Sequence, residues 1–142
     1  MSGILESTKV INGSHGKLYH DGVWMSSVHS VELTIEVNYE DVKRSGTRKI
    51  GKKATTIDSS GTFTSYKVSQ DFVRAIGQIM DDSKGAFVTE LIMQVEDPEN
   101  KDTQQFIRVK GVQFTNIPVM SFEHGSIIED EFNFVFEDYE FM

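Results

Sequence analysis

The chain has 142 residues, no cysteine, and a formal charge of −8 at pH 7 from 14 basic and 22 acidic side chains. Its length is that of one domain, and the missing cysteines exclude disulfides and thiolate metal sites. The residues before Lys17 have neither a basic start nor a long apolar run. We therefore expect residues 1–142 to form a single, non-secreted domain without a signal peptide or a membrane anchor.

Residues 1–14 show no helical or strand period and are rich in Ser, Gly and Asn. We expect an extended N-terminal arm here, with a frayed terminus as the alternative. The next segment, residues 17–25, is predicted to form a β-hairpin. Its turn is Asp21-Gly22, two residues that tolerate the positive φ angles of a type I′ turn.

The clearest strand follows, over residues 31–39. Apolar side chains alternate with polar ones, in the order Val31, Glu32, Leu33, Thr34, Ile35, Glu36, Val37, Asn38 and Tyr39. This period of two predicts a half-buried strand with the odd-numbered side chains on the core. Glu32 and Glu36 then share the opposite face. A second strand is expected over residues 54–68 with one solvent-facing side, and we interpret Gly61 as a bulge within it.

A basic segment joins these two strands and is predicted to be a loop. It contains six cations and no acid, namely Lys43, Arg44, Arg48, Lys49, Lys52 and Lys53. The rest of the chain, with eight bases against 22 acids, carries −14. Such an uneven distribution of charge is informative about binding partners rather than about the fold. A solvated hairpin tip is the simplest alternative.

Two partner classes are open for this basic segment. A monomeric adaptor would use the cations to bind nucleic acid or an acidic protein. Against nucleic acid, no aromatic residue lies among the cations to stack on bases. Residues 111–142 carry seven acids and no Lys or Arg, which favours the second class. In that class identical subunits stack head to tail, a heterologous contact that yields filaments when it does not close.

One helix is predicted after the second strand. Ser69 is a suitable N-cap, Asp71 lies in the first turn, and Lys84-Gly85 is the expected end. Apolar residues recur at three- and four-residue spacing, namely Phe72, Val73, Ile76, Ile79 and Met80. This stripe predicts core packing, with a partner-docking helix as the alternative.

The remainder reads as three long strands, over residues 86–95, 104–122 (bent near Pro118) and 127–141. In the last of them Phe132, Phe134 and Phe136 alternate with more polar residues. We therefore predict a mainly β fold, an antiparallel β-sandwich or barrel with one α-helix. An α/β fold would need more helices for its crossovers.

The sequence contains no catalytic constellation. Its four histidines have no metal-ligand spacing. The acidic turn at residues 97–102 lacks the glycine and the terminal bidentate Glu of a calcium loop. We expect no enzyme activity, no metal and no cofactor, and nothing supports a small β-barrel enzyme.

Several short motifs in this order resemble the PBSX-type tail tube proteins of contractile phage tails and phage-like bacteriocins. The resemblance spans nearly the whole chain. The motifs are Gly16-Lys17-Leu18-Tyr19 with Asp21-Gly22, Arg48-Lys49-x-Gly51-Lys52-Lys53, Gly61-Thr62-x-Thr64 running into Tyr66-Lys67-Val68, Phe72-Val73, and Phe134-x-Phe136-Glu137-Asp138-Tyr139.

The resemblance implies a β-sandwich whose copies close into hexameric rings that stack into a tube. The implied partners are other copies of the chain, the tail sheath, the baseplate and tube-terminating proteins, with DNA only as passing cargo if the particle is a phage. The implied location is the particle tail, assembled in the bacterial host cytoplasm. On this chain the implied inter-ring loop falls on residues 40–55 and the bridging arm on residues 1–14. An acidic lumen would let DNA slide, and Glu32 and Glu36 are the expected lining, with outer surface as the alternative.

Overall fold

The computed structural model describes residues 7, 13, 16–67, 71–95 and 105–141. Eight strands form one antiparallel sheet in the order β2-β1-β5-β6-β7-β4-β3, with β8 paired to β6. The expected N-terminal arm, the Ser69 cap and the acidic turn at residues 97–102 lie outside or almost wholly outside the described residues. The strands are β1 (Gly16–His20), β2 (Val23–Trp24), β3 (Val28–Lys43), β4 (Ile50–Tyr66), β5 (Val88–Val95), β6 (Gln105–Phe114), β7 (Glu129–Val135) and β8 (Asp138–Phe141).

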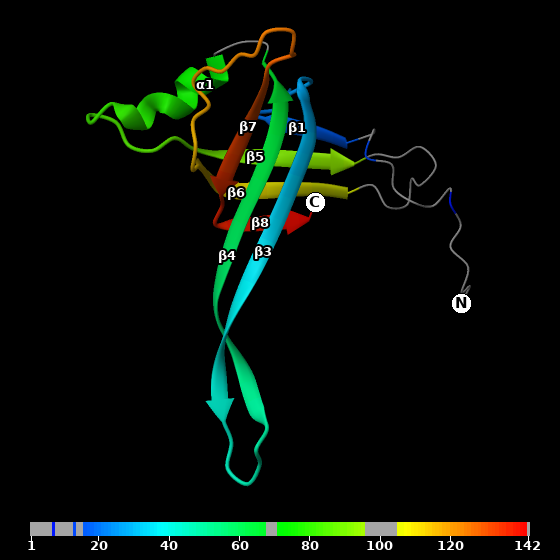
Figure 1. The fold of residues 1–142 in the computed structure, drawn as a ribbon, viewed down its shortest axis with the longest axis vertical. Coiled ribbons are helices and arrows are strands. Elements are labelled where there is room, and N and C mark those ends of the chain that lie inside the picture. Colours follow the sequence, from blue (N-terminus) through cyan, green and yellow to red (C-terminus); the bar gives the residue numbers. More distant parts are fainter. Residues whose placement is uncertain (1–6, 8–12, 14–15, 68–70, 96–104, 142) are drawn as a thin grey trace.

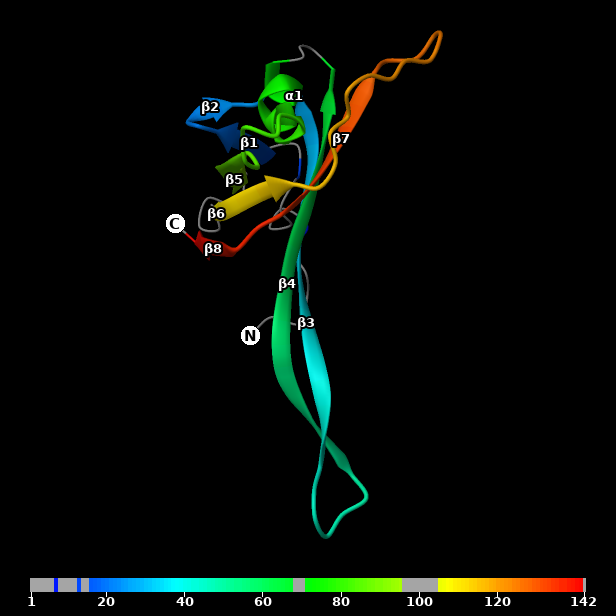
Figure 2. The same cartoon turned by 90° about the vertical axis from the view of Figure 1, so that its left-hand side faces the viewer.

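The sheet folds over on itself, so that β3, β4 and β7 form one layer and β1, β5, β6 and β8 cross behind it (Figures 1 and 2). The corner lies between β6 and β7, whose described pairing is limited to Gln113 with Val135 and Phe114 with Phe134. The predicted mainly antiparallel β-sandwich with one helix is confirmed, and a single sheet supplies both of its layers.

A cluster of phenylalanines fills the space between the two layers. Phe63 of β4 stacks on Phe132 of β7 with ring centroids 4.8 Å apart, and Phe72 meets Phe132 edge-on at 5.3 Å. The predicted alternation in the last part of the chain is confirmed, because Phe132, Phe134 and Phe136 are all buried. The buried apolar residues of the two layers are Leu18, Phe63, Leu91, Val109, Val112, Phe132, Phe134 and Phe136.

The helix is shorter than predicted. Helix α1 spans Asp71–Ile76 and tightens into a 3₁₀ turn at Gly77–Met80. Val73 and Ile76 are buried as expected, but Ile79 and Met80 are exposed. The tighter helical turn rotates them away from the line of the first two residues. Lys84-Gly85 does not end the helix, because the 3₁₀ turn already ends at Met80.

The last two predicted strands are also interrupted. β6 ends at Phe114 because the Asn116 side chain, and no longer the β6 backbone, forms the next hydrogen bonds to β7. Its amide nitrogen donates to the Glu131 carbonyl at 2.9 Å, and its Oδ1 accepts from the Asn133 backbone at 2.6 Å. The final strand breaks at residues 136–137, where β7 leaves β4 and β8 pairs with β6.

Two glycine predictions have different outcomes. The Asp21-Gly22 turn is confirmed, since both residues have positive φ, 51° and 77°, as a type I′ turn requires. The proposed bulge at Gly61 is wrong, because Gly61 pairs regularly with Leu33 and Phe134. A Cβ there would lie 2.4 Å from the Phe134 ring. The two irregularities in this hairpin instead lie between Val28 and Ser30 and after the Asn38–Thr56 pair.

Candidate functional site

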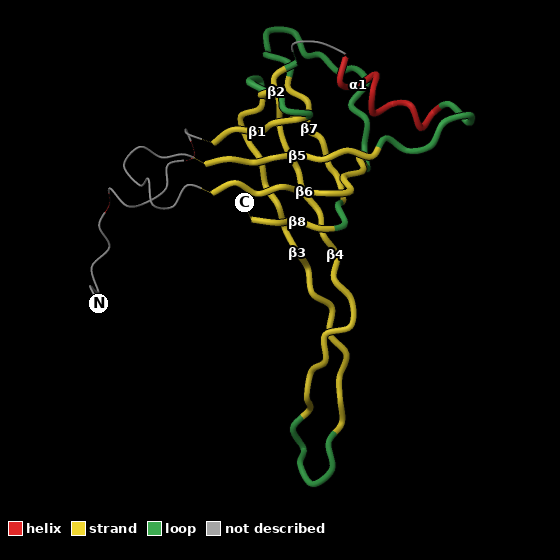
Figure 3. The backbone as a smooth tube through the Cα atoms, turned by 180° about the vertical axis from the view of Figure 1, so that it is seen from behind, coloured by secondary structure: helices red, strands yellow, loops and turns green. Residues whose placement is uncertain are grey.

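A long two-stranded hairpin is the most prominent feature of the molecule. β3 has 16 residues and β4 has 17, and their pairing continues to Lys43–Ile50, so the ribbon extends far below the two layers (Figures 1 and 3). The segment predicted as a loop over residues 40–55 is therefore mostly paired strand, with only residues 44–49 unpaired at the tip. Because β3 and β4 pair almost to the tip, the hairpin is longer than the alternating pattern of either strand alone indicated.

The cations of the basic segment are all exposed, but they are not equivalent. Lys52 forms an ion pair with Asp41, directly opposite on β3. Lys53 lies opposite Glu40. The four other cations, Lys43, Arg44, Arg48 and Lys49, form no ion pair with a described residue. The net positive charge of the hairpin is therefore concentrated at its tip.

One face of the hairpin is polar and acidic, as the alternation predicts. Glu32 and Glu36 are both exposed on it, and Glu36 lies opposite Asp58. β7 extends this face alongside β4, where Thr62 donates to the Asn133 side chain at 2.7 Å and Glu131 lies opposite Thr64. A row of carboxylates thus runs along three adjacent strands.

The other face is apolar on β3 from Val31 to Tyr39, but only its upper part is covered by the chain itself. Val31 and Leu33 pack on the core. The prediction that the whole stripe is half-buried is wrong for the lower part, because Ile35, Val37 and Tyr39 are exposed below the body. Ile57, opposite Val37, adds to this stripe and is 66% exposed.

A shallow apolar groove lies where the hairpin leaves the body. It measures about 280 Å³ and is lined by Leu33, Ile35, Ile107, Phe136 and Tyr139. Its walls come from β3, from β6 and from the end of the chain. The apolar face of the hairpin therefore continues directly from the core into an open surface.

The outer edge of β3 has no strand partner among the described residues, since β3 ends the order of the sheet. An unpaired edge of this length presents a row of backbone donors and acceptors to any other strand. The edge strand is also long enough to accept one.

The family that the chain belongs to follows from comparison with known proteins. The family described as phage tail tube protein matches residues 3–142. The chain belongs to this family. It is 27% identical over 137 residues to the phage-like element PBSX protein XkdM of Bacillus subtilis (strain 168), covering 96% of this chain and 92% of the relative.

Solved tail tube structures share the fold. One is the sheath–tube complex of an extracellular contractile injection system, PVC, in its extended state, with a TM-score of 0.74 and 12% identity over 94% of this chain and 91% of that one. Another is the tail of an empty gene transfer agent particle with C6 symmetry, with a TM-score of 0.58 and 14% identity over 98% and 99% of the two chains. The predicted resemblance is confirmed, and the role of the chain is that of a structural tail tube protein rather than an enzyme.

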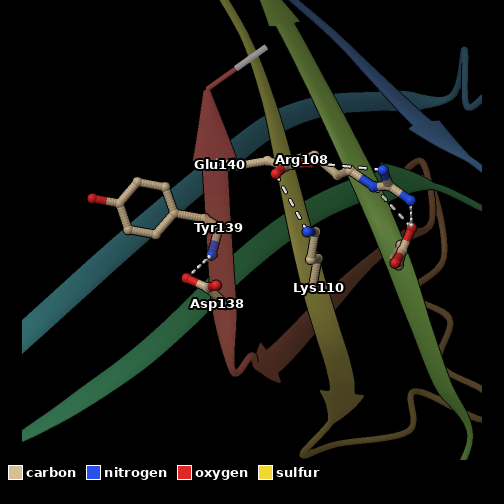
Figure 4. Close-up of polar contacts among 6 residues, drawn as sticks. Arg108, Lys110, Asp138, Tyr139 and Glu140 are labelled. Carbon is tan, nitrogen blue, oxygen red and sulfur yellow. Dashed lines mark hydrogen bonds and ion pairs between the residues drawn. The ribbon is translucent and has the colours of Figure 1, made fainter.

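The sequence analysis missed a charged network on the outer face of β5, β6 and β8 (Figure 4). Arg108 donates to Glu90 at 2.6 Å and lies 3.6 Å from Glu140, which also meets Lys110 at 3.3 Å. The hydrogen bond that Arg108 donates to Glu90, and then the negative charge of Glu90, raise the pKa of the Arg108 guanidinium. The alternate spacing of the charges at 108 and 110 could have indicated this face.

A buried ion pair was missed as well. Lys67, at the end of the hairpin, donates to Asp130 of β7 at 2.8 Å, and the two side chains are only 9% and 6% exposed. Their sequence separation of 63 residues left no local signal.

His20 has a packing role, because it bonds Thr89 at 2.9 Å and contacts the Phe72 ring edge-on.

Within the described ranges, no group of three or more His, Cys, Asp or Glu residues is placed to hold a metal ion. No helix in those ranges has the length and apolar character needed to cross a membrane. The candidate functional features of the described residues are surfaces: the acidic face, the apolar stripe, the basic tip and the open edge.

Proposed function

We propose that six copies of this chain close into a ring, and that the rings stack into the inner tube of a contractile particle. The observation that carries the proposal is the long hairpin of β3 and β4, which combines an acidic face, an apolar face, a basic tip and an open edge in one element. A monomer has no use for such a ribbon, whereas a tube subunit needs a contact in each of these directions.

Ring closure is supported by the open edge of β3. Pairing this edge with a strand of the neighbouring copy satisfies backbone groups that would otherwise promote aggregation. The C6 symmetry of the related gene transfer agent tail agrees with six copies. In such a ring β3, β4 and β7 of every copy contribute to one continuous wall.

The acidic face is the proposed lining of the lumen, with Glu32 and Glu36 as its central carboxylates. The upper part of the opposite face packs on the core, so there the acidic face is the one left free to line a channel. Duplex DNA carries one charge per roughly 1.7 Å of its axis. Anionic walls repel those phosphates, and DNA, where the particle carries it, remains mobile as passing cargo.

The basic segment is the proposed contact between rings, with the arm at residues 1–14 as a second bridge. The segment comprises Lys43, Arg44, Arg48, Lys49, Lys52 and Lys53. Of these, Lys52 is already paired with Asp41. The cations at the tip form no ion pair with a described residue and are therefore available to a neighbouring ring. Exposed ion pairs contribute only about 0.2–1 kcal/mol each. Repetition around a ring makes them sufficient to set the direction of stacking.

The remaining partners are the sheath, on the outer face of the tube, and the baseplate and terminator at its ends. The fold is shared with the tube of a sheath–tube complex, with a sheath/tube terminator and with a sixfold baseplate structure. The charged face with Arg108 and Glu140 lies opposite the core on the outer layer, where a sheath would lie. Assembly takes place in the cytoplasm of the bacterial host.

Sizing and electron microscopy of the purified chain test the proposal. The wild type is expected to form rings and tubes, and a chain that stays monomeric at high concentration would refute it. Reversing Arg48 and Lys49 to Glu should leave folded rings that do not elongate. The control reverses Lys84, an exposed cation after α1 that forms no ion pair with a described residue. Lys52 is left intact because its reversal would place two carboxylates together within the hairpin.

A further inference from the structure

The loop between β6 and β7, residues 115–128, carries exposed apolar side chains that the fold does not use. Phe122 is 83% exposed and Ile127 is 79% exposed, and Met120 is exposed beside them. Small soluble domains rarely leave several large apolar side chains together in water unless they form an interaction site.

This β6–β7 loop has a defined backbone. It is tied to β7 where the Thr115 amide donates to the Asn133 carbonyl at 2.8 Å. Its tip is closed by a turn in which the Ser126 amide donates to the Glu123 carbonyl at 3.1 Å, with Gly125 at φ 83°. A groove of about 320 Å³ lies between its two arms, lined by residues 121–123 and 126–129.

The loop and the hairpin tip lie at opposite ends of the long axis of the molecule (Figure 2). The lower part of the hairpin has its own exposed apolar stripe, formed by Val37, Tyr39 and Ile57. Each copy of the chain therefore presents two uncovered apolar surfaces, one toward each end of its long axis.

The charges at the two ends are of opposite sign. The tip of the hairpin has four cations without an ion pair among the described residues. The β6–β7 loop and the start of β7 carry Glu123, Glu129 and Glu131, and no Lys or Arg occurs from Gly111 to the end of the chain. Complementary potentials steer partners and fix their orientation. The acidic loop repels a second loop but attracts a basic hairpin.

We propose that the β6–β7 loop is the docking surface for the hairpin of a second copy of this chain in the adjacent ring. The apolar stripe with Ile57 packs against Phe122 and Ile127, and the tip cations lie against the glutamates beside them. This inference rests on the proposed tube and names the surface that receives the hairpin. The contact is heterologous, so each copy has one hairpin to give and one loop to receive.

Crosslinking between engineered cysteines tests the contact directly, because the chain has no cysteine of its own. Ile57→Cys and Phe122→Cys subunits of different tag lengths are mixed, assembled and treated with a flexible bismaleimide. The expected product is a heterodimer of the two tags. The matched control replaces Phe122→Cys with Met80→Cys, a residue beside α1 that is also 83% exposed. A yield no higher than that control, or dimers of Phe122→Cys subunits alone, would overturn the inference.

A second variant separates this contact from the tube itself. Phe122→Ser with Ile127→Ser should fold normally, since both side chains are exposed, but should raise the concentration needed for elongation by roughly tenfold or more. Met80→Ser should not change it. Wild-type tubes together with unchanged elongation of the double variant would refute the loop contact and leave the tube standing. A wild type that forms no rings or tubes would refute both.

Discussion

Gly61 lies where the hairpin leaves the body, and its replacement by Ala tests the packing at that point. A Cβ on Gly61 would lie 2.4 Å from the Phe134 ring and 2.8 Å from Leu33. Phe134 is 1% exposed and surrounded by other rings, so it has little room to move. Overpacking of this kind costs about 1–3 kcal/mol. The lower chain entropy of Ala in the unfolded state offsets about 0.4–1 kcal/mol of that cost.

The expected net loss is about 1–2 kcal/mol, which lowers the Tm by about 3–8 °C for a domain of this size. Circular dichroism melts of the unassembled subunit measure it. Gly77→Ala is the matched control, because its Cβ would have no atom within 4 Å and Ala favours the helical turn. The two changes should therefore shift the Tm in opposite directions. Equal or raised Tm values for both variants would show that the contact between Gly61 and Phe134 is not tight.

Three further predictions concern the core, the buried ion pair and the proposed lumen. Ile76→Ala should cost about 2–5 kcal/mol, because the side chain is 3% exposed, whereas Ile79→Ala should fall within about 0.5 kcal/mol; denaturant titration of both decides. Lys67→Met should cost about 3–5 kcal/mol by leaving the Asp130 carboxylate buried without this partner, and adding Asp130→Asn should recover part of the lost Tm. Replacing Glu32 and Glu36 by Lys should make assembled tubes retain polyanions, and a tube structure with these residues outside the lumen would contradict their assignment.

The sequence predicts where the strands lie and which side of each strand is apolar. It does not predict how much of that apolar side the folded chain covers. Alternation from Val31 to Tyr39 identifies an apolar side because the side-chain period of a strand is two. It does not tell whether the chain itself reaches that side. In the folded molecule the body covers the stripe only as far as Leu33, and this limit depends on where β6 and β8 cross the hairpin.

The ends of elements depend on single side chains that pattern analysis treats as ordinary polar residues. Asn116 stops β6 by forming two hydrogen bonds to the backbone of β7, and the next twelve residues form a loop rather than a strand. The sequence therefore predicted a bent strand up to Phe122 and another strand from Ile127, where the structure has the β6–β7 loop. The basic tip was predictable because its cations are close together in the sequence. The Lys67–Asp130 ion pair was not, because its two residues are 63 positions apart in the sequence.

Ion pairs and apolar contacts between rings have different roles in the proposed tube. At physiological ionic strength charges are screened over about 8 Å, so the tip cations act only when an adjacent ring is already near. Part of the positive charge is also compensated within the hairpin by Asp41 and Glu40. Charge alone would therefore hold rings weakly. The apolar stripe and the β6–β7 loop supply contact energy that salt does not screen, while the opposite charges at the two ends ensure that a hairpin meets a loop and not another hairpin.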